Sequence, residues 1–236
     1  MRRHAYAELV QVEISASPSF SFATITIPPG GEVHAEAGAM AAYSDGVEIE
    51  TTARGGMMAG LRRSVLGGES FFINTFTASA GPGEVIVAPA LPGDIIHLPV
   101  PTDGTAIMVQ SGSWLASEAG VTVDTKWGGA KTFFSGEGLF MLRCSGSGDM
   151  LVASYGAIFE MDLPAGESYK VDTGHIVAFE EGIGYQVNKV GGWKSTILSG
   201  EGLVATFTGP GKLWQQSRSP ADLVGWLTEK LPFTRS

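Results

Sequence analysis

The chain has 236 residues and a formal net charge of −9, from 15 Lys and Arg against 24 Asp and Glu. Proteins that bind nucleic acid or anionic membranes gather basic side chains, so this acidic balance argues against both partners. Hydrophobic residues make up 44% of the chain, which is typical of a globular protein and too high for a disordered chain.

The single cysteine, Cys144, excludes an intramolecular disulfide and any metal site with several cysteines. It lies in the apolar run LFMLRC, so we expect a buried structural thiol. At the N-terminus, Glu8 stands where a signal peptide needs an apolar stretch. No stretch approaches the roughly 18 uninterrupted apolar residues of a membrane span. We therefore expect a cytoplasmic protein with no membrane span.

One unit of sequence occurs three times along the chain. Its copies read GAMAAYSDGVEIETTARGG from Gly38, GSWLASEAGVTVDTKWGG from Gly112 and GHIVAFEEGIGYQVNKVGG from Gly174. We call these three residues the repeat glycines. Glycine suits turns that need positive φ or a close backbone approach, so we expect all three to share one backbone setting.

Each copy continues into a phrase that contains Gly and Glu, namely GGESFF, SGEGLF or SGEGLV. The phrase places Glu69, Glu137 and Glu201 at equivalent positions. It is neither the elbow of a serine nucleophile nor a phosphate loop, because the flanking glycines, helix and lysine of those motifs are missing. We expect the three glutamates to bond backbone groups or to pair between copies.

The copies have the pattern of β-strands. VEIET, VTVDT and YQVNK alternate apolar and polar residues, as half-buried strands do. The exception is SPADLVGWLTEKL near the C-terminus, which predicts a helix capped by Ser219 with Pro220 at its first position. Its apolar stripe consists of Leu223, Trp226, Leu227 and Leu231. The sequence thus predicts an all-β fold with a short C-terminal helix.

The repeats divide the chain into unit 1 at 1–94, unit 2 at 95–157 and unit 3 at 158–218, followed by a helix and tail at 219–236. From repeat glycine to matched glutamate there are 31, 25 and 27 residues in the three copies, and the excess of unit 1 falls at 54–68. Insertions in repeat proteins often lie on the binding face. We predict a partner-binding segment here, the alternative being a flap packed on its own or a neighbouring subunit. Its candidate contact residues are Arg54, Met57, Met58, Leu61, Arg62 and Arg63.

Two kinds of chemical site can be weighed. We expect no metal and no cofactor, because no repeat position gathers the histidines, which are His4, His34, His97 and His175. Asp172, His175 and Glu180 lie close together in DTGHIVAFEEG and offer an acid–base site in the third copy as an alternative. Against that alternative, an Asp at a turn commonly bonds backbone amides.

The motifs GGEVHAEAGAM, GGESFF, DTGHIVAF, VGG, SGEGL and TGPGKLW follow one another over nearly the whole chain. In this order they resemble the mitochondrial-biogenesis family named for altered inheritance of mitochondria, member twenty-four, and in particular its bacterial and archaeal branch of unknown function. The resemblance implies a fold similar to the tryptophan RNA-binding attenuation protein, a small β-sandwich unit that assembles into rings. It therefore implies three tandem sandwich units per chain, and three chains that close a ring of nine.

We expect a non-enzymatic, ring-forming scaffold or interaction module, a homotrimer with an unidentified protein partner. The alternative is an enzyme or small-ligand-binding protein with its site in the third repeat or between subunits. Binding of single-stranded nucleic acid comes last, because the sequence lacks the interleaved aromatic and basic residues of a stacking platform.

Overall fold

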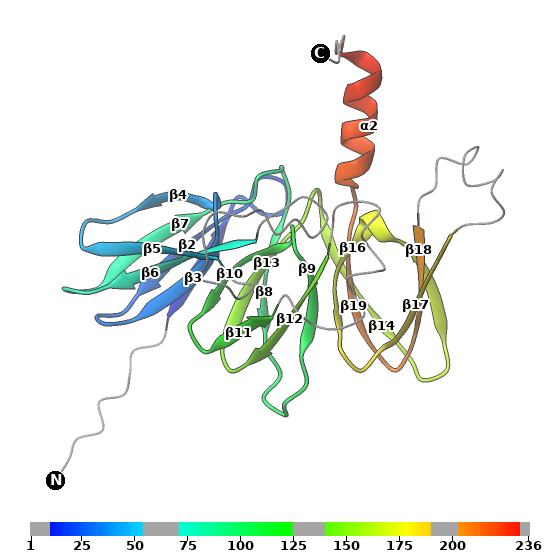
Figure 1. Cartoon of the computed structure of the whole chain (residues 1–236), viewed down its shortest axis with the longest axis horizontal. Helices are drawn as coiled ribbons and strands as arrows, with labels where there is room; N and C mark the ends of the chain where they lie inside the picture. The colour runs from blue at the N-terminus through cyan, green and yellow to red at the C-terminus, as the bar shows by residue number, and fades with distance from the viewer. Residues whose placement is uncertain (1–9, 54–70, 125–139, 190–202, 232–236) are drawn as a thin grey trace.

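The computed structural model describes residues 10–53, 71–124, 140–189 and 203–231. Over these residues the chain forms nineteen β-strands and one α-helix (Figure 1), so the predicted all-β fold with a C-terminal helix is confirmed. The candidate contact residues of the 54–68 insertion, and likewise Glu69, Glu137 and Glu201, lie outside the described residues.

After the N-terminal strand β1 (Gln11–Ser15), the strands come in three groups of six. The first group, here unit 1, contains β2 (Phe22–Ile27), β3 (Glu32–Glu36), β4 (Met40–Tyr43), β5 (Val47–Ala53), β6 (Phe72–Ala78) and β7 (Gly83–Val87). Unit 2 contains β8 (Ile95–Pro99), β9 (Ile107–Gln110), β10 (Trp114–Glu118), β11 (Val121–Asp124), β12 (Met141–Gly146) and β13 (Asp149–Ala153). Unit 3 contains β14 (Ile158–Leu163), β15 (Ser168–Asp172), β16 (Ile176–Glu180), β17 (Gly184–Lys189), β18 (Leu203–Thr208) and β19 (Gly211–Gln216).

All three units use the same antiparallel pairing. In unit 2, for example, β8, β13 and β10 form one half-sheet, and β11, β12 and β9 form the other. Neighbouring units share sheets, because β3 pairs with β10 and β9 pairs with β16. The result is two complete six-stranded sheets in the middle of the chain. A four-stranded sheet, β1-β2-β7-β4, precedes them and a three-stranded sheet, β15-β18-β17, follows them.

The hydrophobic core is divided among the spaces between successive sheets. The first cluster joins strands of unit 1, such as that of Phe76, to Leu115 and Leu151 of unit 2. The last joins Phe179 and Phe207 of unit 3 to Met108 of unit 2. Truncating a buried Phe to Ala typically lowers the free energy of unfolding by about 3–5 kcal/mol. Since each core needs side chains from a neighbouring unit, no unit completes its core alone.

The repeat glycines occupy the same place in the strand order but not the same conformation. Each lies in the turn that joins the second and third strands of its unit, yet only Gly38 has a positive φ, of 96°. A Cβ on Gly112 would meet open space, whereas a Cβ on Gly174 would lie 2.7 Å from Oγ of Ser219. The expectation of one shared backbone setting is therefore wrong.

The physical reason is a different turn in unit 3. In units 1 and 2 the turn is closed by a single backbone bond, from Ala39 N to Glu36 O in unit 1 and from Ser113 N to Gln110 O in unit 2. In unit 3 the residues Thr173–His175 form a short 3-10 helix, η2. The three units instead share a conformation in the turn between their first and second strands, where φ is 74° at Gly30, 90° at Gly104 and 84° at Gly166.

The segments that lead into the three units lie side by side. Ser21 N donates to the carbonyl oxygen of Gly93 at 3.0 Å, and Asp94 N donates to that of Gly156 at 3.0 Å. Gly93 and Gly156 also form a parallel bridge. Oδ1 of Asp94 accepts bonds from the hydroxyls of Ser17 and Ser21. We call this row of segments the linker row.

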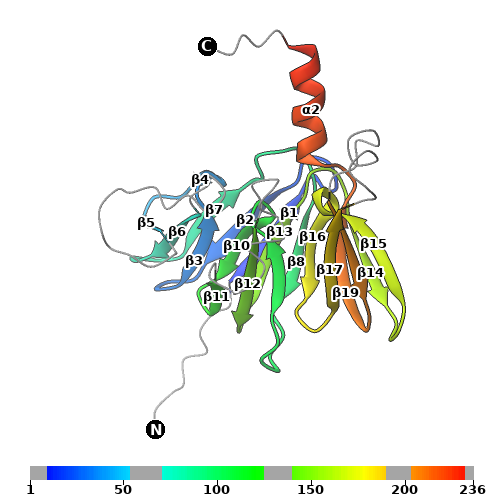
Figure 2. The same cartoon turned by 45° about the vertical axis from the view of Figure 1, so that its right-hand side comes forward.

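The C-terminal helix, α2 (Pro220–Lys230), stands away from the sheets (Figures 1 and 2). Ser219 is its N-cap, with Oγ accepting a bond from Asp222 N, and Pro220 occupies the first turn, as predicted. None of its residues is buried.

The expectation of a buried thiol is confirmed. Cys144 on β12 is fully shielded from solvent, and its burial raises the pKa of the thiol to about 12. At neutral pH the thiol is therefore an uncharged part of the core that lies between the two six-stranded sheets.

The linker row gives a test of the close packing between units. A Cβ on Gly93 would clash with the carbonyl oxygen of Ser154, which is backbone and cannot move aside easily. We expect Gly93→Ala to lower the free energy of unfolding by about 1–3 kcal/mol, measured by urea denaturation. Gly112→Ala is the matched control, because its new methyl group would meet open space; its effect should stay within about 1 kcal/mol of zero. Equal effects of the two substitutions would contradict this account of the linker row.

Candidate functional site

The three residues of the acid–base alternative each bind the main chain. Oδ1 of Asp172 accepts from Gly174 N at 2.8 Å. Nδ1 of His175 donates to the carbonyl oxygen of Gln216 at 2.8 Å. Oε2 of Glu180 accepts from Lys212 N at 3.0 Å. The bond of Asp172 caps η2, and those of His175 and Glu180 hold η2 and β16 against β19, so each of the three side chains has a structural role.

A residue that sequence reasoning missed completes this arrangement. The amide of Gln216, which is buried, donates from Nε2 to Gly174 O at 2.8 Å and accepts at Oε1 from Tyr155 N at 2.9 Å. Gln216 thereby ties η2 to the segment that leads into unit 3. The only sequence signal was a second glutamine in WQQS, on a strand that is otherwise largely apolar.

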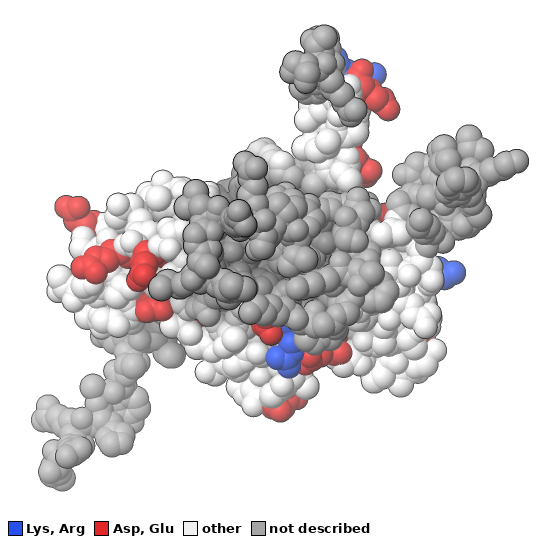
Figure 3. All heavy atoms as spheres, viewed as in Figure 1, with Lys and Arg blue, Asp and Glu red and all other residues white. Residues whose placement is uncertain are grey.

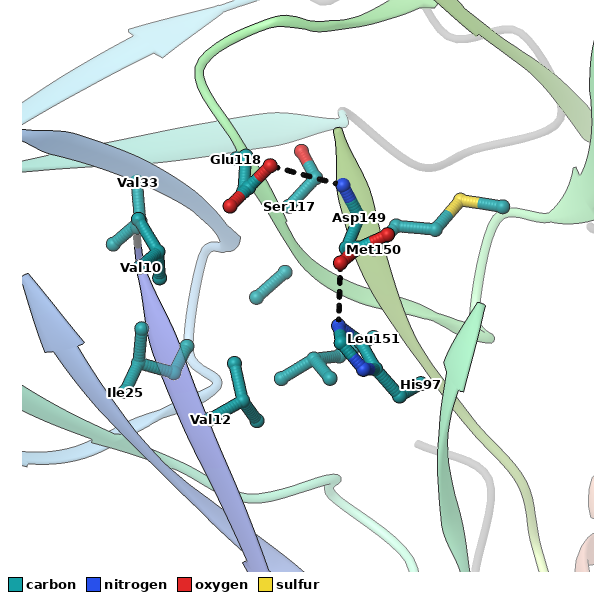
Figure 4. A pocket seen from close by; sticks show the side chains of 11 residues that line it. Val10, Val12, Ile25, Val33, His97, Ser117, Glu118, Asp149, Met150 and Leu151 are labelled. Carbon is teal, nitrogen blue, oxygen red and sulfur yellow. Dashed lines mark hydrogen bonds and ion pairs between the residues drawn. The ribbon is translucent and has the colours of Figure 1, made fainter. Parts of the chain in front are cut away.

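A small cavity lies between β1 and the sheet of β10, β13 and β8 (Figure 4). Its volume is about 20 Å³, which suits one water molecule rather than a substrate. At its polar side, Nε2 of His97 lies 3.2 Å from Oδ2 of Asp149, and Asp149 N donates to Oε2 of Glu118. Ser117 Oγ is buried in the cavity wall without a hydrogen-bond partner in the described part of the chain. A single water that satisfies this hydroxyl is the occupant that the cavity fits.

The described residues offer no metal centre, since they contain no group of three or more His, Cys, Asp or Glu that could hold an ion. The contact of His97 with Asp149 is half exposed, and among the described residues no third ligand of these types lies beside it.

The strongest candidate for function is a pair of open sheet edges at opposite ends of the strand array. β4 is the last strand of the four-stranded sheet, and β15 is the first of the three-stranded sheet. Exposed on these edges are Ala42 and Tyr43 of β4, and Tyr169 and Lys170 of β15. Their equivalents inside the chain are buried, because there the second strand of one unit pairs with the third strand of the next.

The two pairings inside the chain have one register. Where unit 1 meets unit 2, Ala116 lies opposite Ala35 and Ser117 opposite His34. Where unit 2 meets unit 3, the equivalent residues pair in the same way, with Ala178 opposite Val109 and Phe179 opposite Met108.

The third strand of each unit is also bent in the same way. Its pairing with the sixth strand shifts register between Trp114 and Ala116 in unit 2, and between Ile176 and Ala178 in unit 3. The same irregularity occurs on the open edge of unit 1, between Met40 and Ala42. The edge of β4 thus has the local geometry of two strands that already pair with a neighbouring unit.

One ion pair reinforces the contact between units 2 and 3. The guanidinium of Arg143 on β12 donates from Nε to Glu181 Oε1 at 2.6 Å and from Nη2 to Oε2 at 2.9 Å. Glu181 lies in the turn between β16 and β17. The hydrogen bonds from Arg143 lower the pKa of the Glu181 carboxyl, and the same bonds raise the pKa of the guanidinium.

Within the described residues, no helix is long and apolar enough to span a membrane. The only α-helix among them, α2, has 11 residues.

Comparison with known proteins agrees with this architecture. Residues 12–218 match the family described as "Mitochondrial biogenesis AIM24", and the chain belongs to this family. An uncharacterized protein of Streptococcus pyogenes serotype M6 is 30% identical over 227 residues, which cover 93% of this chain and 90% of that protein. The crystal structure of a Streptococcus pyogenes protein superposes with a TM-score of 0.77 at 27% identity, over 94% of this chain and 100% of that chain.

The ion pair between units gives a prediction about pH. Because Arg143 lowers the pKa of Glu181 below its usual 4.5, the pair contributes stability above pH 4.5 and loses it as the pH falls through the lowered pKa. We expect Arg143→Met to lower the free energy of unfolding by about 0.5–1 kcal/mol at pH 7. The difference from the unmodified chain should vanish in strong acid.

Arg143→Lys is the control for this prediction, because it keeps the charge but loses the two-pronged geometry, and it should show a smaller loss. Denaturation at a series of pH values measures both variants. A loss for Arg143→Met that is the same at pH 3 and pH 7 would show that packing, rather than the ion pair, is responsible.

Proposed function

We propose that the protein is a non-enzymatic, cytoplasmic scaffold, built as a ring in which three chains join nine units. The observation that carries the proposal is the pair of incomplete sheets at the ends of the strand array. Each end holds one half of the six-stranded sheet that occurs twice in the middle. β15 of one copy and β4 of the next would complete it.

The register of this contact follows from the two pairings inside the chain. Transferred to the open edges, it places Ala42 opposite Val171, Tyr43 opposite Lys170 and Ser44 opposite Tyr169. The tyrosines are 49% and 43% exposed. Burying large aromatic side chains of this kind supplies a driving force of about 1.5–3 kcal/mol each.

Physical considerations favour a closed ring over an open chain of copies. An unpaired strand edge invites association with other strands. The two edges differ, so the contact is head-to-tail, and such a contact either closes or grows into a filament. The net charge of −9 favours a soluble, closed assembly. The number of three chains comes from the resemblance to the ring-forming attenuation protein.

The surface supports a protein rather than a nucleic acid as the partner of the ring. Glu48 and Glu50 on β5 are exposed, and Figure 3 shows acidic side chains gathered at the end of the molecule that unit 1 forms. Such a surface repels phosphates. The ring would repeat the same faces around its axis, and the 54–68 segment of each chain is our candidate for contact with the partner.

The register can be tested by the sign of one charge. Tyr43→Lys would place a lysine opposite Lys170 of the preceding copy, and like charges directly opposite each other weaken strand pairing. Tyr43→Glu is the matched control, because it also removes the ring of the tyrosine but places a carboxylate opposite Lys170. Light scattering should report about three times the 24.7 kDa chain mass for the unmodified protein. On dilution, the lysine variant should dissociate at much higher concentration than the glutamate variant.

Tyr43 is half exposed in the single chain, so neither substitution should alter the fold of the monomer. An unmodified protein that stays monomeric at all concentrations would contradict the ring. Equal dissociation of the two variants would contradict the register.

A further inference from the structure

Two exposed apolar features have no partner within the described residues of the chain. The first is α2, none of whose residues is buried, with Trp226 58% exposed. The second is Phe20 in the turn between β1 and β2, which at 72% is the most exposed large hydrophobic side chain described. Aromatic side chains are enriched at protein–protein interfaces relative to the rest of the surface.

Phe20 is held in a fixed turn rather than on a loose loop. Its backbone N–H donates to the carbonyl oxygen of Ala16 at 3.3 Å. The neighbouring hydroxyls of Ser17 and Ser21 both donate to Oδ1 of Asp94. The side chain of Phe20 is therefore exposed on a turn that hydrogen bonds hold in place, with Ser17 before it and Ser21 after it both bound to Asp94.

The linker row shows where this turn would lie in a ring. Ser21, Asp94 and Ala157 directly precede the first strands of the three units. The N–H of Ser21 donates to the carbonyl oxygen of Gly93, the residue just before Asp94. In the same way, the N–H of Asp94 donates to the carbonyl oxygen of Gly156, the residue just before Ala157. Continued by one step, the same pattern brings the carbonyl oxygen of Phe20 from the next copy to the N–H of Ala157.

α2 begins beside that position. Ala157 N donates to Oγ of Ser217 at 3.0 Å, and Ser217 N donates back to Ala157 O at 3.0 Å. In unit 2 the equivalent bonds join Asp94 and Ser154. After Ser154 the chain continues directly into unit 3. In unit 3 it continues instead through Arg218 to the helix cap Ser219. The first turns of α2 therefore start where the β1–β2 turn of the next copy would be placed.

We propose that α2 binds the β1–β2 turn of the next copy, with the apolar stripe of the helix covering Phe20. Leu223 and Leu227 lie at the centre of the stripe and Trp226 beside them, because these positions are three and four residues apart on one helical face. The contact joins aromatic and aliphatic side chains, which is the composition of interface centres. The inference rests on the proposed ring, and it gives each junction a second contact besides the strand pair.

The test is a double-mutant cycle on the dissociation of the full-length protein, followed by light scattering on dilution. We expect Phe20→Ala and Trp226→Ala each to raise the trimer dissociation midpoint at least fivefold. The double variant should be little worse than either single variant, because both remove the same contact. Phe20→Leu should restore most of the binding, since it keeps an apolar side chain.

Phe159→Ala on β14 is the control, because this side chain is also exposed, at 46%, but lies on a strand that joins no proposed contact. It should leave the midpoint unchanged. If the unmodified protein is a trimer and the Phe20 and Trp226 variants dissociate as it does, the helix contact is wrong and the ring stands. If the effects of the two substitutions multiply in the double variant, the residues do not touch and the contact is also overturned. A monomeric unmodified protein would overturn the ring itself.

Discussion

Antiparallel pairing between the second strand of one unit and the third strand of the next is the interaction on which this structure depends. It occurs twice in the chain, between β3 and β10 and between β9 and β16. Because of it, each six-stranded sheet belongs to two units and each core contains side chains from a neighbour. The same pairing leaves both ends of the chain with half of a sheet, which is why we place the function of the protein in assembly.

The sequence was sufficient to predict what depends on local pattern. The alternation in VEIET or VTVDT predicts strands, and Ser219 followed by Pro220 marks the start of α2. The departure at Gly174 could not be predicted in this way. Its 3-10 turn is bonded by Gln216 and packs closely against Ser219, and both residues are more than 40 positions away in sequence. The matching glycines therefore predicted their place in the strand order, while tertiary contacts determine the backbone conformation of each glycine.

The same distinction explains the candidate site. Asp172, His175 and Glu180 are close in sequence, a pattern that also suits catalysis, but each binds a backbone group. The pairing of His97 with Asp149 was invisible in the sequence because it needs the alignment of β8 with β13. Open edges are likewise a property of the topology. The sequence could indicate that the first and last copies have complementary edges, but the register and the strand bend come from the structure.

Hydrogen exchange of the backbone amides measures whether β4 and β15 are paired between copies. In the protein at high concentration, we expect the peptides of β4 and β15 to exchange as slowly as those of β10 and β9, their equivalents inside the chain. At low concentration, where the ring dissociates, the same two peptides should become the fastest-exchanging of the four. Fast exchange of β4 and β15 at every concentration would contradict the account, because it would show that these edges stay open to water.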